Sequence, residues 1–184
     1  MKSLAVFCGS QSGADPAYAA AAAELGTELA RRGVTLVYGG GRVGLMGVVA
    51  AACVGAGGRV VGVIPEFLAA KEIAFAEATE LHLVATMHQR KAIMADRADA
   101  VAVLPGGYGT MDELFEILTW GQLGLHAMPV ALLNVRGFFD PLLAWVDHLT
   151  REGFVQARHR ELLRVAGDVA GLFDALDPRG PDVR

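Results

Sequence analysis

The fold is decided by residues 99–118, which read DAVAVLPGGYGTMDELFEIL. The run of small and β-branched apolar residues over 99–103 predicts a strand that is buried on both faces of a parallel sheet. Apolar residues between Leu114 and Leu125 recur at helical spacing, so we expect a helix to follow. Open α/β sheets bind ligands at the carboxyl ends of their strands, and glycines let a backbone approach a ligand closely. The glycine-rich loop 105–109 is therefore expected at a binding site.

Thr110 is the expected N-cap of this helix, and two interpretations are open. In the first, Thr110 and Glu113 form a capping box, in which Glu113 reaches back to the cap amide and has no chemical role. In the second, the loop amides and Thr110 bind a phosphate at the helix N-terminus, while Glu113 points past it. The loop 105–109 favours the second interpretation, because a cap needs no glycine-rich loop. Asp112 and Glu113 are about 100° apart around the helix, so at most one of them faces a ligand directly.

The composition is that of one globular domain. The chain has 184 residues, a formal net charge of −4 and a pI of about 5.7, without a break in composition. We expect a single nucleotide-binding domain over residues 1–176 and a flexible tail over residues 177–184. The acidic balance excludes a general attraction to nucleic acid or to acidic membranes, so an anionic ligand must be held locally.

Cysteine usage and the N-terminus predict a cytoplasmic protein. Cys8 and Cys53 stand in apolar surroundings without metal-type spacing, so we expect buried, reduced thiols. The N-terminus has no signal-peptide cleavage pattern. The longest charge-free run, residues 43–58, is too short for a membrane span and is expected to form a buried helix. The five histidines show no metal-ligand spacing, and no metal is expected.

Strand and helix patterns alternate along the whole chain. The expected strands cover residues 4–7, 34–38, 59–64, 81–84, 99–103, 129–133 and, weakly, 163–165. The other expected helices cover residues 15–33, 43–58, 86–97 and 138–152, with a last helix after the weak strand. Regular alternation predicts an α/β fold with a Rossmann-like, doubly wound and mostly parallel sheet in a single domain.

Three loops at strand carboxyl ends are expected to converge. They are Gly9-Ser10, residues 39–44 and residues 106–110. Ser10 stands outside a G-x-S-x-G context, so contact with phosphate or sugar is expected rather than nucleophilic attack. Gly40 and Gly41 are included in the candidate site because their loop also follows the carboxyl end of a strand.

The second loop also matches a dinucleotide fingerprint. Gly39, Gly41 and Gly44 have the G-x-G-x-x-G spacing, and Glu66 lies roughly twenty residues further on. The match follows the second strand rather than the first, and Glu66 lies beyond the end of its strand. Close packing of a helix against the sheet is the favoured interpretation, and NAD or FAD is not expected.

The segment Thr86-Met-His-Gln-Arg-Lys91 places two cations near the start of an expected helix. Thr86 and Gln89 form a second capping-box pattern, so Arg90 and Lys91 fall within about the first turn and a half. Cations there oppose the helix macrodipole. An anion opposite Arg90 would remove this penalty, because a guanidinium binds phosphate or carboxylate bidentately. Arg90 keeps its proton, so its role would be electrostatic or orienting.

Together these motifs resemble the Lonely Guy family of cytokinin riboside 5′-monophosphate phosphoribohydrolases. The resemblance rests on residues 105–113, 87–91 and 39–47, and it runs from residue 4 to about residue 154. It implies a cofactor-free homodimer that hydrolyses the N-glycosidic bond of an adenosine-type (AMP-like) nucleoside 5′-monophosphate, releasing the free base and ribose 5-phosphate. Arg90 and Glu113 match the catalytic pair. The substrate-contacting positions that match are Glu72, Lys91, Gly106, Gly107, Tyr108, Gly109, Thr110, Met111, Asp112 and Thr119. Gly9, Ser10, Gly40, Gly41 and Met87 complete the candidate site.

The chemistry of these residues is consistent with that activity. Cleavage of a ribosyl bond develops positive charge on the sugar, and the Glu113 carboxylate can stabilise this charge or activate water. Arg90 either keeps Glu113 ionised or binds the sugar phosphate, and the sequence leaves both roles open. A non-catalytic nucleotide-binding or sensing protein is the alternative, because glycine loops alone fit it equally well.

A third label, lysine decarboxylase, has been given to proteins of this resemblance. That reaction uses pyridoxal phosphate and needs a lysine that forms a Schiff base. The chain has only Lys2, Lys71 and Lys91, and none of them stands in a convincing cofactor site. The sequence therefore gives this label little support.

Overall fold

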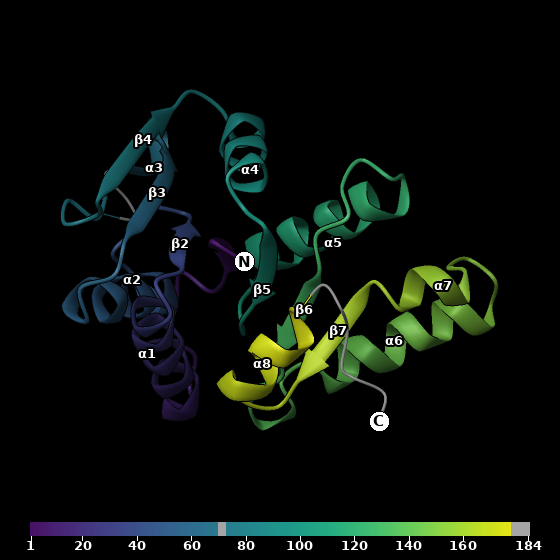
Figure 1. Ribbon diagram of the computed structural model, residues 1–184. Helices are drawn as coiled ribbons and strands as arrows, with labels where there is room; N and C mark the ends of the chain where they lie inside the picture. The colour runs from purple at the N-terminus through teal and green to yellow at the C-terminus, as the bar shows by residue number, and fades with distance from the viewer. Residues whose placement is uncertain (70–72, 178–184) are drawn as a thin grey trace.

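A seven-stranded parallel sheet forms the centre of the protein (Figure 1). The computed structural model describes residues 1–69 and 73–177. The strand order is β4-β3-β2-β1-β5-β6-β7, and all six pairings are parallel. The strands are β1 (Ser3–Phe7), β2 (Thr35–Tyr38), β3 (Val60–Pro65), β4 (Glu80–Val84), β5 (Ala100–Val103), β6 (Val130–Leu133) and β7 (Leu163–Ala166). The predicted doubly wound α/β fold is confirmed.

The chain builds this sheet outward from β1 in two directions. It first adds β2, β3 and β4 on one side, and then returns to place β5 against the other side of β1. The winding therefore reverses between β1 and β5. In open α/β sheets this reversal opens a crevice at the carboxyl ends of the strands, where ligands bind.

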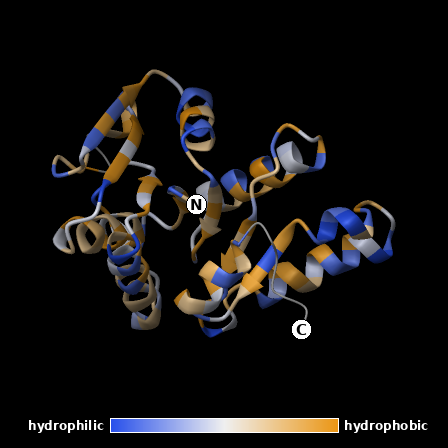
Figure 2. Cartoon of the chain, in the orientation of Figure 1, coloured by the Kyte–Doolittle hydropathy of each residue, from blue (hydrophilic) through white to orange (hydrophobic). Residues whose placement is uncertain are grey.

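Helices cover both faces of the sheet because the strand residues are apolar on both sides. Leu4 and Val6 of β1 pack on one face, while Ala5 and Phe7 pack on the other. The first face is covered by α1 (Pro16–Arg31), α2 (Gly44–Gly55) and α8 (Val169–Ala175). The second face is covered by α4 (Met87–Asp96), α5 (Tyr108–Gln122) and α6 (Asp140–Arg151). Figure 2 shows hydrophobic residues concentrated in the strands and hydrophilic residues on α4 and α6.

Two helices begin at the predicted residues. The Asp15 side chain accepts a hydrogen bond from the Ala17 amide, at 2.9 Å, and Pro16 opens α1. The Thr86 side chain accepts one from the Gln89 amide, at 3.2 Å, and caps α4. This cap fixes where the first turn of α4 begins, and so it fixes the position of the Arg90 side chain along the helix.

The predicted cap of α5 is wrong. The helix begins at Tyr108 with Gly107 as N-cap, so Thr110 lies inside the first turn and cannot act as the cap residue of a capping box. Tyr108 and Gly109 already have helical conformation, so the helix starts two residues before Thr110. Leu125 lies beyond the end of this helix.

Smaller differences concern strand ends and short helices. Pro65 does not close the third strand but belongs to it, and it pairs with Val84 of β4. Three short helices were not predicted from the sequence: α3 (Glu66–Ala69), η1 (Val135–Gly137) and α7 (Ala157–Arg160). Of the tail expected over residues 177–184, only Asp177 belongs to the described part of the chain. Within the described residues, no helix combines the length and apolar character needed to cross a membrane.

Candidate active site

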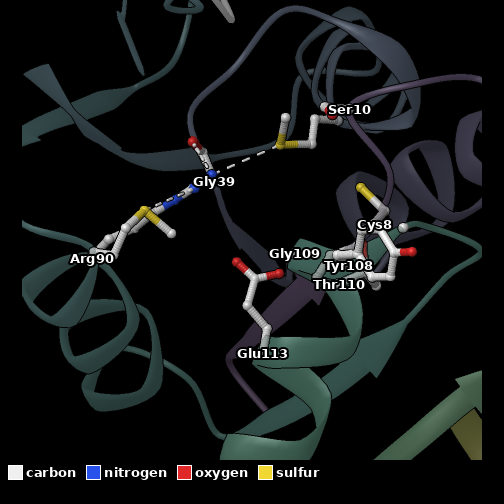
Figure 3. Close-up of a pocket in the computed structure, with 12 residues that line it drawn as sticks. Cys8, Ser10, Gly39, Arg90, Tyr108, Gly109, Thr110 and Glu113 are labelled. Atoms are coloured by element: carbon white, nitrogen blue, oxygen red, sulfur yellow. Dashed lines mark hydrogen bonds between the residues drawn. The ribbon is translucent and has the colours of Figure 1, made fainter. Parts of the chain in front are cut away.

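A cavity of about 140 Å³ opens at the carboxyl ends of the central strands. Loops after β1, β2 and β5 and the first turn of α4 surround it (Figure 3). The three loops are in contact, because the Gly9 amide donates to the Pro105 carbonyl at 3.0 Å and the Leu45 amide donates to the Gly9 carbonyl at 3.0 Å. The lining residues are Val6, Cys8, Ser10, Gly39, Met46, Met87, Arg90, Gly107, Tyr108, Gly109, Thr110 and Glu113.

The glycine-rich loop brings the N-terminus of α5 to this cavity. Thr110 is buried in the first turn of the helix, and the backbone of Gly106 lies against it. A Cβ atom at Gly106 would lie 2.1 Å from the Thr110 Oγ1 atom, so this approach requires glycine. The N-cap Gly107 makes no side-chain cap. The first amides of α5 and the positive end of its dipole therefore lie beside the cavity, an arrangement that favours an anion.

Glu113, rather than Asp112, faces the cavity. Thr110 and Glu113 are three residues apart and share one face of α5, and both are buried. In Figure 3 the Glu113 carboxylate points from the helix into the space between Arg90 and the Thr110 region. Asp112 is exposed and accepts a hydrogen bond from the Lys91 ammonium at 3.0 Å. The cavity thus contains one carboxylate from the second turn of α5.

Arg90 enters the cavity from α4 and is 5% exposed. Its Nε atom donates to the Val63 carbonyl at 3.2 Å, and its Nη2 atom donates to the Gly39 carbonyl at 2.9 Å. These carbonyls lie at the carboxyl ends of β3 and β2. The guanidinium is therefore fixed by backbone atoms of two strands, in the same cavity as the Glu113 carboxylate.

Cys8 lies at the end of β1 beside these charges. Burial raises the pKa of the Cys8 thiol, and the negative charge of Glu113 raises it further, while Arg90 lowers it. Cys53 is buried elsewhere in the core, and burial raises its pKa to about 11. Both cysteines are free and buried, as predicted. Cys8 is therefore a neutral thiol at neutral pH.

Several predicted site residues lie elsewhere. Lys91 is not part of the cavity lining, and its ammonium lies 3.0 Å from both Asp112 and Glu116 of α5. Met111 packs against the hydrophobic core, and the exposed Thr119 donates to the Phe115 carbonyl at 2.6 Å. Glu72 lies outside the described residues.

The predicted glycines divide between the cavity and its surroundings. Gly107 and Gly109 line the cavity, whereas Gly9 and Gly106 line a neighbouring apolar cavity of about 210 Å³. Gly40 packs its backbone against β3, and its carbonyl accepts from the Phe75 amide at 2.9 Å. Gly41 forms an isolated bridge with Ala74. Ser10 lines both cavities and separates them together with Gly107.

Four lining residues were not predicted from the sequence: Val6, Cys8, Gly39 and Met46. Gly39 belongs to the loop 39–44, which was expected to converge with two other loops, and to the dinucleotide fingerprint, but it was not predicted as a site residue. Its position directly after a strand was the available signal, because neighbouring parallel strands end at the same edge of the sheet. The two sulfur atoms gave no signal, since Cys8 and Met46 stand in apolar sequence that is typical of a core.

The residues do not fit pyridoxal phosphate. Of the lysines in the described part of the chain, Lys2 lies at the amino end of β1, where its amide donates to Asp99. Lys91 is ion-paired with α5. Neither lines the cavity. Among residues 1–69 and 73–177, no three His, Cys, Asp or Glu side chains are grouped as metal ligands.

Comparison with known proteins finds a matching family, and relatives that match over nearly the full chain. The family described as "possible lysine decarboxylase" matches residues 46–176. A probable cytokinin riboside 5′-monophosphate phosphoribohydrolase of Oryza sativa subsp. japonica is 51% identical over 178 residues, covering 97% of this chain and 78% of the relative. A cytokinin riboside 5′-monophosphate phosphoribohydrolase of Arabidopsis thaliana is 48% identical over 181 residues, covering 98% of this chain and 83% of the relative.

A solved structure has the same fold at lower sequence identity. The molybdenum cofactor carrier protein from Chlamydomonas reinhardtii superposes with a TM-score of 0.70 at 22% identity, and the match covers 94% of each chain. At this identity the similarity concerns the arrangement of strands and helices alone.

Proposed function

Because this chain belongs to the Lonely Guy family of cytokinin riboside 5′-monophosphate phosphoribohydrolases, we propose that it hydrolyses the N-glycosidic bond of such nucleotides. The products are the free adenine-type base and ribose 5-phosphate. One observation carries the proposal: a buried carboxylate, Glu113, and a buried guanidinium, Arg90, line the same cavity as the glycine-rich N-terminus of α5.

The 5′-phosphate binds at the start of α5 in this proposal. The amides of residues 107–110 and the hydroxyl of Thr110 lie beside the cavity, and the helix dipole adds positive potential there. The net charge of the chain is −4, so a local site of this kind is needed to hold a dianion.

Glu113 acts on the sugar. It lies one turn of α5 below Thr110, so a nucleotide with its phosphate at the helix N-terminus brings its ribose toward the carboxylate. As the glycosidic bond breaks, positive charge develops on the ribose, and a nearby carboxylate stabilises it or removes a proton from the attacking water. The water oxygen bonds to C1′ of the ribose, and the base leaves with the bonding electron pair and gains a proton.

Arg90 supplies fixed positive charge in the same cavity. Its bonds to the Val63 and Gly39 carbonyls hold the guanidinium in place before substrate arrives. A preorganised cation of this kind favours the ionised form of Glu113 and attracts the anionic substrate. The role proposed for Arg90 is therefore electrostatic and orienting.

A nucleotide-binding protein without turnover is the alternative function. The glycine-rich loop supports it equally well, because an anion site at a helix N-terminus requires no catalysis. The burial of a carboxylate in the same cavity favours the enzyme, since a carboxylate repels a bound phosphate and weakens simple binding.

The test is release of the free base. The purified protein is incubated with AMP and, separately, with AMP carrying an isoprenoid substituent on the adenine. Chromatography measures the free base and ribose 5-phosphate, which should form in equal amounts. Glu113→Gln serves as the inactive control. Tight binding of either nucleotide without release of base would support the non-catalytic alternative and contradict the enzyme.

We also propose a homodimer in the cytoplasm. The exposed leucines 123 and 125 after α5, together with Phe154, offer apolar surface for a second copy of the chain. The two free, buried thiols suit a reducing compartment. Sedimentation equilibrium of the full chain at micromolar concentration tests the dimer, and a monomeric mass would contradict it.

A further inference from the structure

The glycines after β2 differ in what surrounds them. A Cβ atom built on Gly44 would lie 2.3 Å from the backbone carbon of Ser10, and one on Gly47 would lie 1.8 Å from the Arg42 carbonyl oxygen. On Gly40 it would lie 3.0 Å from the Cβ atom of Ile64, on β3. These three glycines therefore allow segments of the fold to pack closely.

Gly39 is different because its neighbour is the functional guanidinium. A Cβ atom there would lie 2.0 Å from the Nη2 atom of Arg90 and 3.0 Å from the Met46 sulfur. The same Nη2 atom donates to the carbonyl of Gly39 at 2.9 Å. Gly39 thus provides a hydrogen-bond acceptor for Arg90, and its missing side chain leaves the space that the guanidinium occupies.

Three further contacts surround the guanidinium. Its Nε atom is fixed on the Val63 carbonyl, and the sulfur atoms of Met87 and Met46 lie 3.9 Å from Nη1 and 4.0 Å from Nη2. Arg90 is only 5% exposed and lines the cavity, so a guanidinium displaced from these contacts can move only toward the cavity.

We infer that Gly39 is a positioning residue for Arg90: its missing side chain and its carbonyl together set the place of the guanidinium in the active site. The inference rests on the proposed function, in which Arg90 acts on the nucleotide. Gly39 differs in this respect from Gly40, Gly44 and Gly47, because the atoms nearest to those three glycines do not belong to Arg90.

Gly39→Ala is the informative substitution. Gly39 does not adopt the left-handed backbone conformation that disfavours alanine, whereas Gly40 and Gly44 have φ values of 76° and 57°. The new methyl group therefore meets the far end of a flexible side chain instead of the backbone, and Arg90 moves while the fold is kept. A displacement of about 1 Å at a catalytic group can cost roughly 10²-fold in rate.

A double-mutant cycle tests whether Gly39 acts through Arg90. Gly39→Ala is expected to lower kcat by roughly 10- to 100-fold with a smaller change in KM. In an Arg90→Ala background the same substitution should change kcat by less than about twofold, because the group it displaces is gone. Gly55→Ala, at a glycine with no atom near its added Cβ, is the matched control and should retain wild-type rates. Independent, multiplicative effects of the two substitutions would overturn the inference.

A second measurement does not depend on activity. The Nε–H group of Arg90 is buried on the Val63 carbonyl, so it should give a slowly exchanging side-chain signal in ¹⁵N NMR, assigned by its loss in Arg90→Lys. Gly39→Ala should shift this signal or abolish its protection, and Gly55→Ala should leave it in place. An unchanged signal in Gly39→Ala contradicts the inference, even if the chain proves not to hydrolyse nucleotides.

Chemical rescue covers the case in which Gly39→Ala does not fold. With Gly39 intact, guanidinium ion should restore part of the activity of Arg90→Ala by occupying the vacated position on the two carbonyls, and methylammonium should restore less. Failure of guanidinium to restore activity in a folded Arg90→Ala variant would contradict the inference, whereas an inactive wild-type protein would contradict only the proposed function.

Discussion

The amino and carboxyl ends of the sheet join the same strands in different ways. At the amino end, the Asp99 carboxylate before β5 accepts from the amides of Lys2 and Ser3 of β1, at 2.5 and 3.1 Å. At the carboxyl end, backbone hydrogen bonds from Gly9 to Pro105 and from Leu104 to Phe7 join the two segments, and their loops border a cavity with buried charges. The amino end uses its polar groups to join strands, whereas the carboxyl end directs them into the cavity.

This difference separates stability from chemistry along one sheet. Substitutions at the carboxyl end should reduce turnover more than stability, because the buried Arg90 and Glu113 face the cavity. Substitutions at the amino end should do the reverse. Each prediction below tests one side of this contrast.

Glu113→Gln should have the largest effect. The amide keeps the size of the side chain but removes the negative charge, so kcat should fall by roughly 10²–10⁴, the usual contribution of a positioned acid or base. The measurement is steady-state release of free base at saturating nucleotide.

Thermal unfolding of the same variant provides the contrast with stability. Its Tm should stay within a few degrees of the wild type, and Glu24→Gln on the exposed side of α1 should change neither rate nor Tm. Normal turnover in a folded Glu113→Gln variant would remove the carboxylate from the mechanism.

Arg90→Lys should come second, with a loss of roughly 10- to 10²-fold in kcat/KM. A lysine keeps the charge but cannot donate in one plane to both the Val63 and Gly39 carbonyls, so the cation loses its fixed position. The kinetics should be compared with those of Arg97→Lys, because Arg97 is the exposed C-cap residue of α4. If Arg90→Lys and Arg97→Lys are equally active, the planar guanidinium is unnecessary.

The sequence predicted those parts of the site that depend on local pattern. Strand and helix alternation gave the sheet, and Asp15 and Thr86 identified the starts of α1 and α4, because side-chain caps act within three residues. Thr110 misled for the same reason. It has the local signature of a cap, but Gly107 ends the loop earlier and the helix already includes Tyr108.

What the sequence could not predict depends on contacts between distant segments. The seat of Arg90 combines the end of β2 with the end of β3, and only the strand order brings both to α4. Local pattern placed Gly39 in a fingerprint and in a loop at a strand end, but its contact with Arg90 joins residues 51 positions apart in the chain. The ion pairs of Lys91 also need the start of α5 to lie within reach of α4, which no local pattern specifies.

Lys91→Met should have a smaller effect at the carboxyl end. Although burial lowers the pKa of Lys91, the hydrogen bonds that its ammonium donates to Glu116 and Asp112 raise the pKa above the ordinary lysine value, so the ammonium stays charged and links α4 to α5. Its loss should lower kcat/KM by up to about tenfold and stability by about 1 kcal/mol, because Arg90 sits on the linked helix.

A second variant separates this linking role from contact with substrate. Lys91→Met leaves two carboxylates without the ammonium, and Glu116 is the more buried of them, so Lys91→Met/Glu116→Gln should restore most of the lost stability and activity. The measurements are Tm and KM of both variants. A large increase in KM that persists in the double variant would show that Lys91 contacts the nucleotide, as the family resemblance implies.

Asp99→Asn should have the smallest effect and should act only on stability. Hydrogen bonds from the Lys2 and Ser3 amides hold the pKa of Asp99 below its ordinary value, so the ionised carboxylate stabilises the fold above about pH 4. This contribution is lost as the pH falls from there through the lower pKa of the folded state. Asparagine keeps an acceptor oxygen but removes the charge, so at pH 7 the variant should lose about 1 kcal/mol of unfolding free energy, discounted for exposure.

Urea unfolding at pH 7 and near pH 3 measures the expected convergence of the two proteins. The gap between wild type and Asp99→Asn should narrow at the lower pH, while kcat at pH 7 stays within about twofold of the wild type because Asp99 lies at the opposite end of β5 from the cavity. Asp174→Asn, at an exposed position on α8, controls for the general effect of removing a negative charge. A large loss of kcat in Asp99→Asn would mean that the two ends of the sheet are coupled. The hydrogen bonds of Asp99 at the amino end would then help to position Arg90 and Glu113 at the carboxyl end.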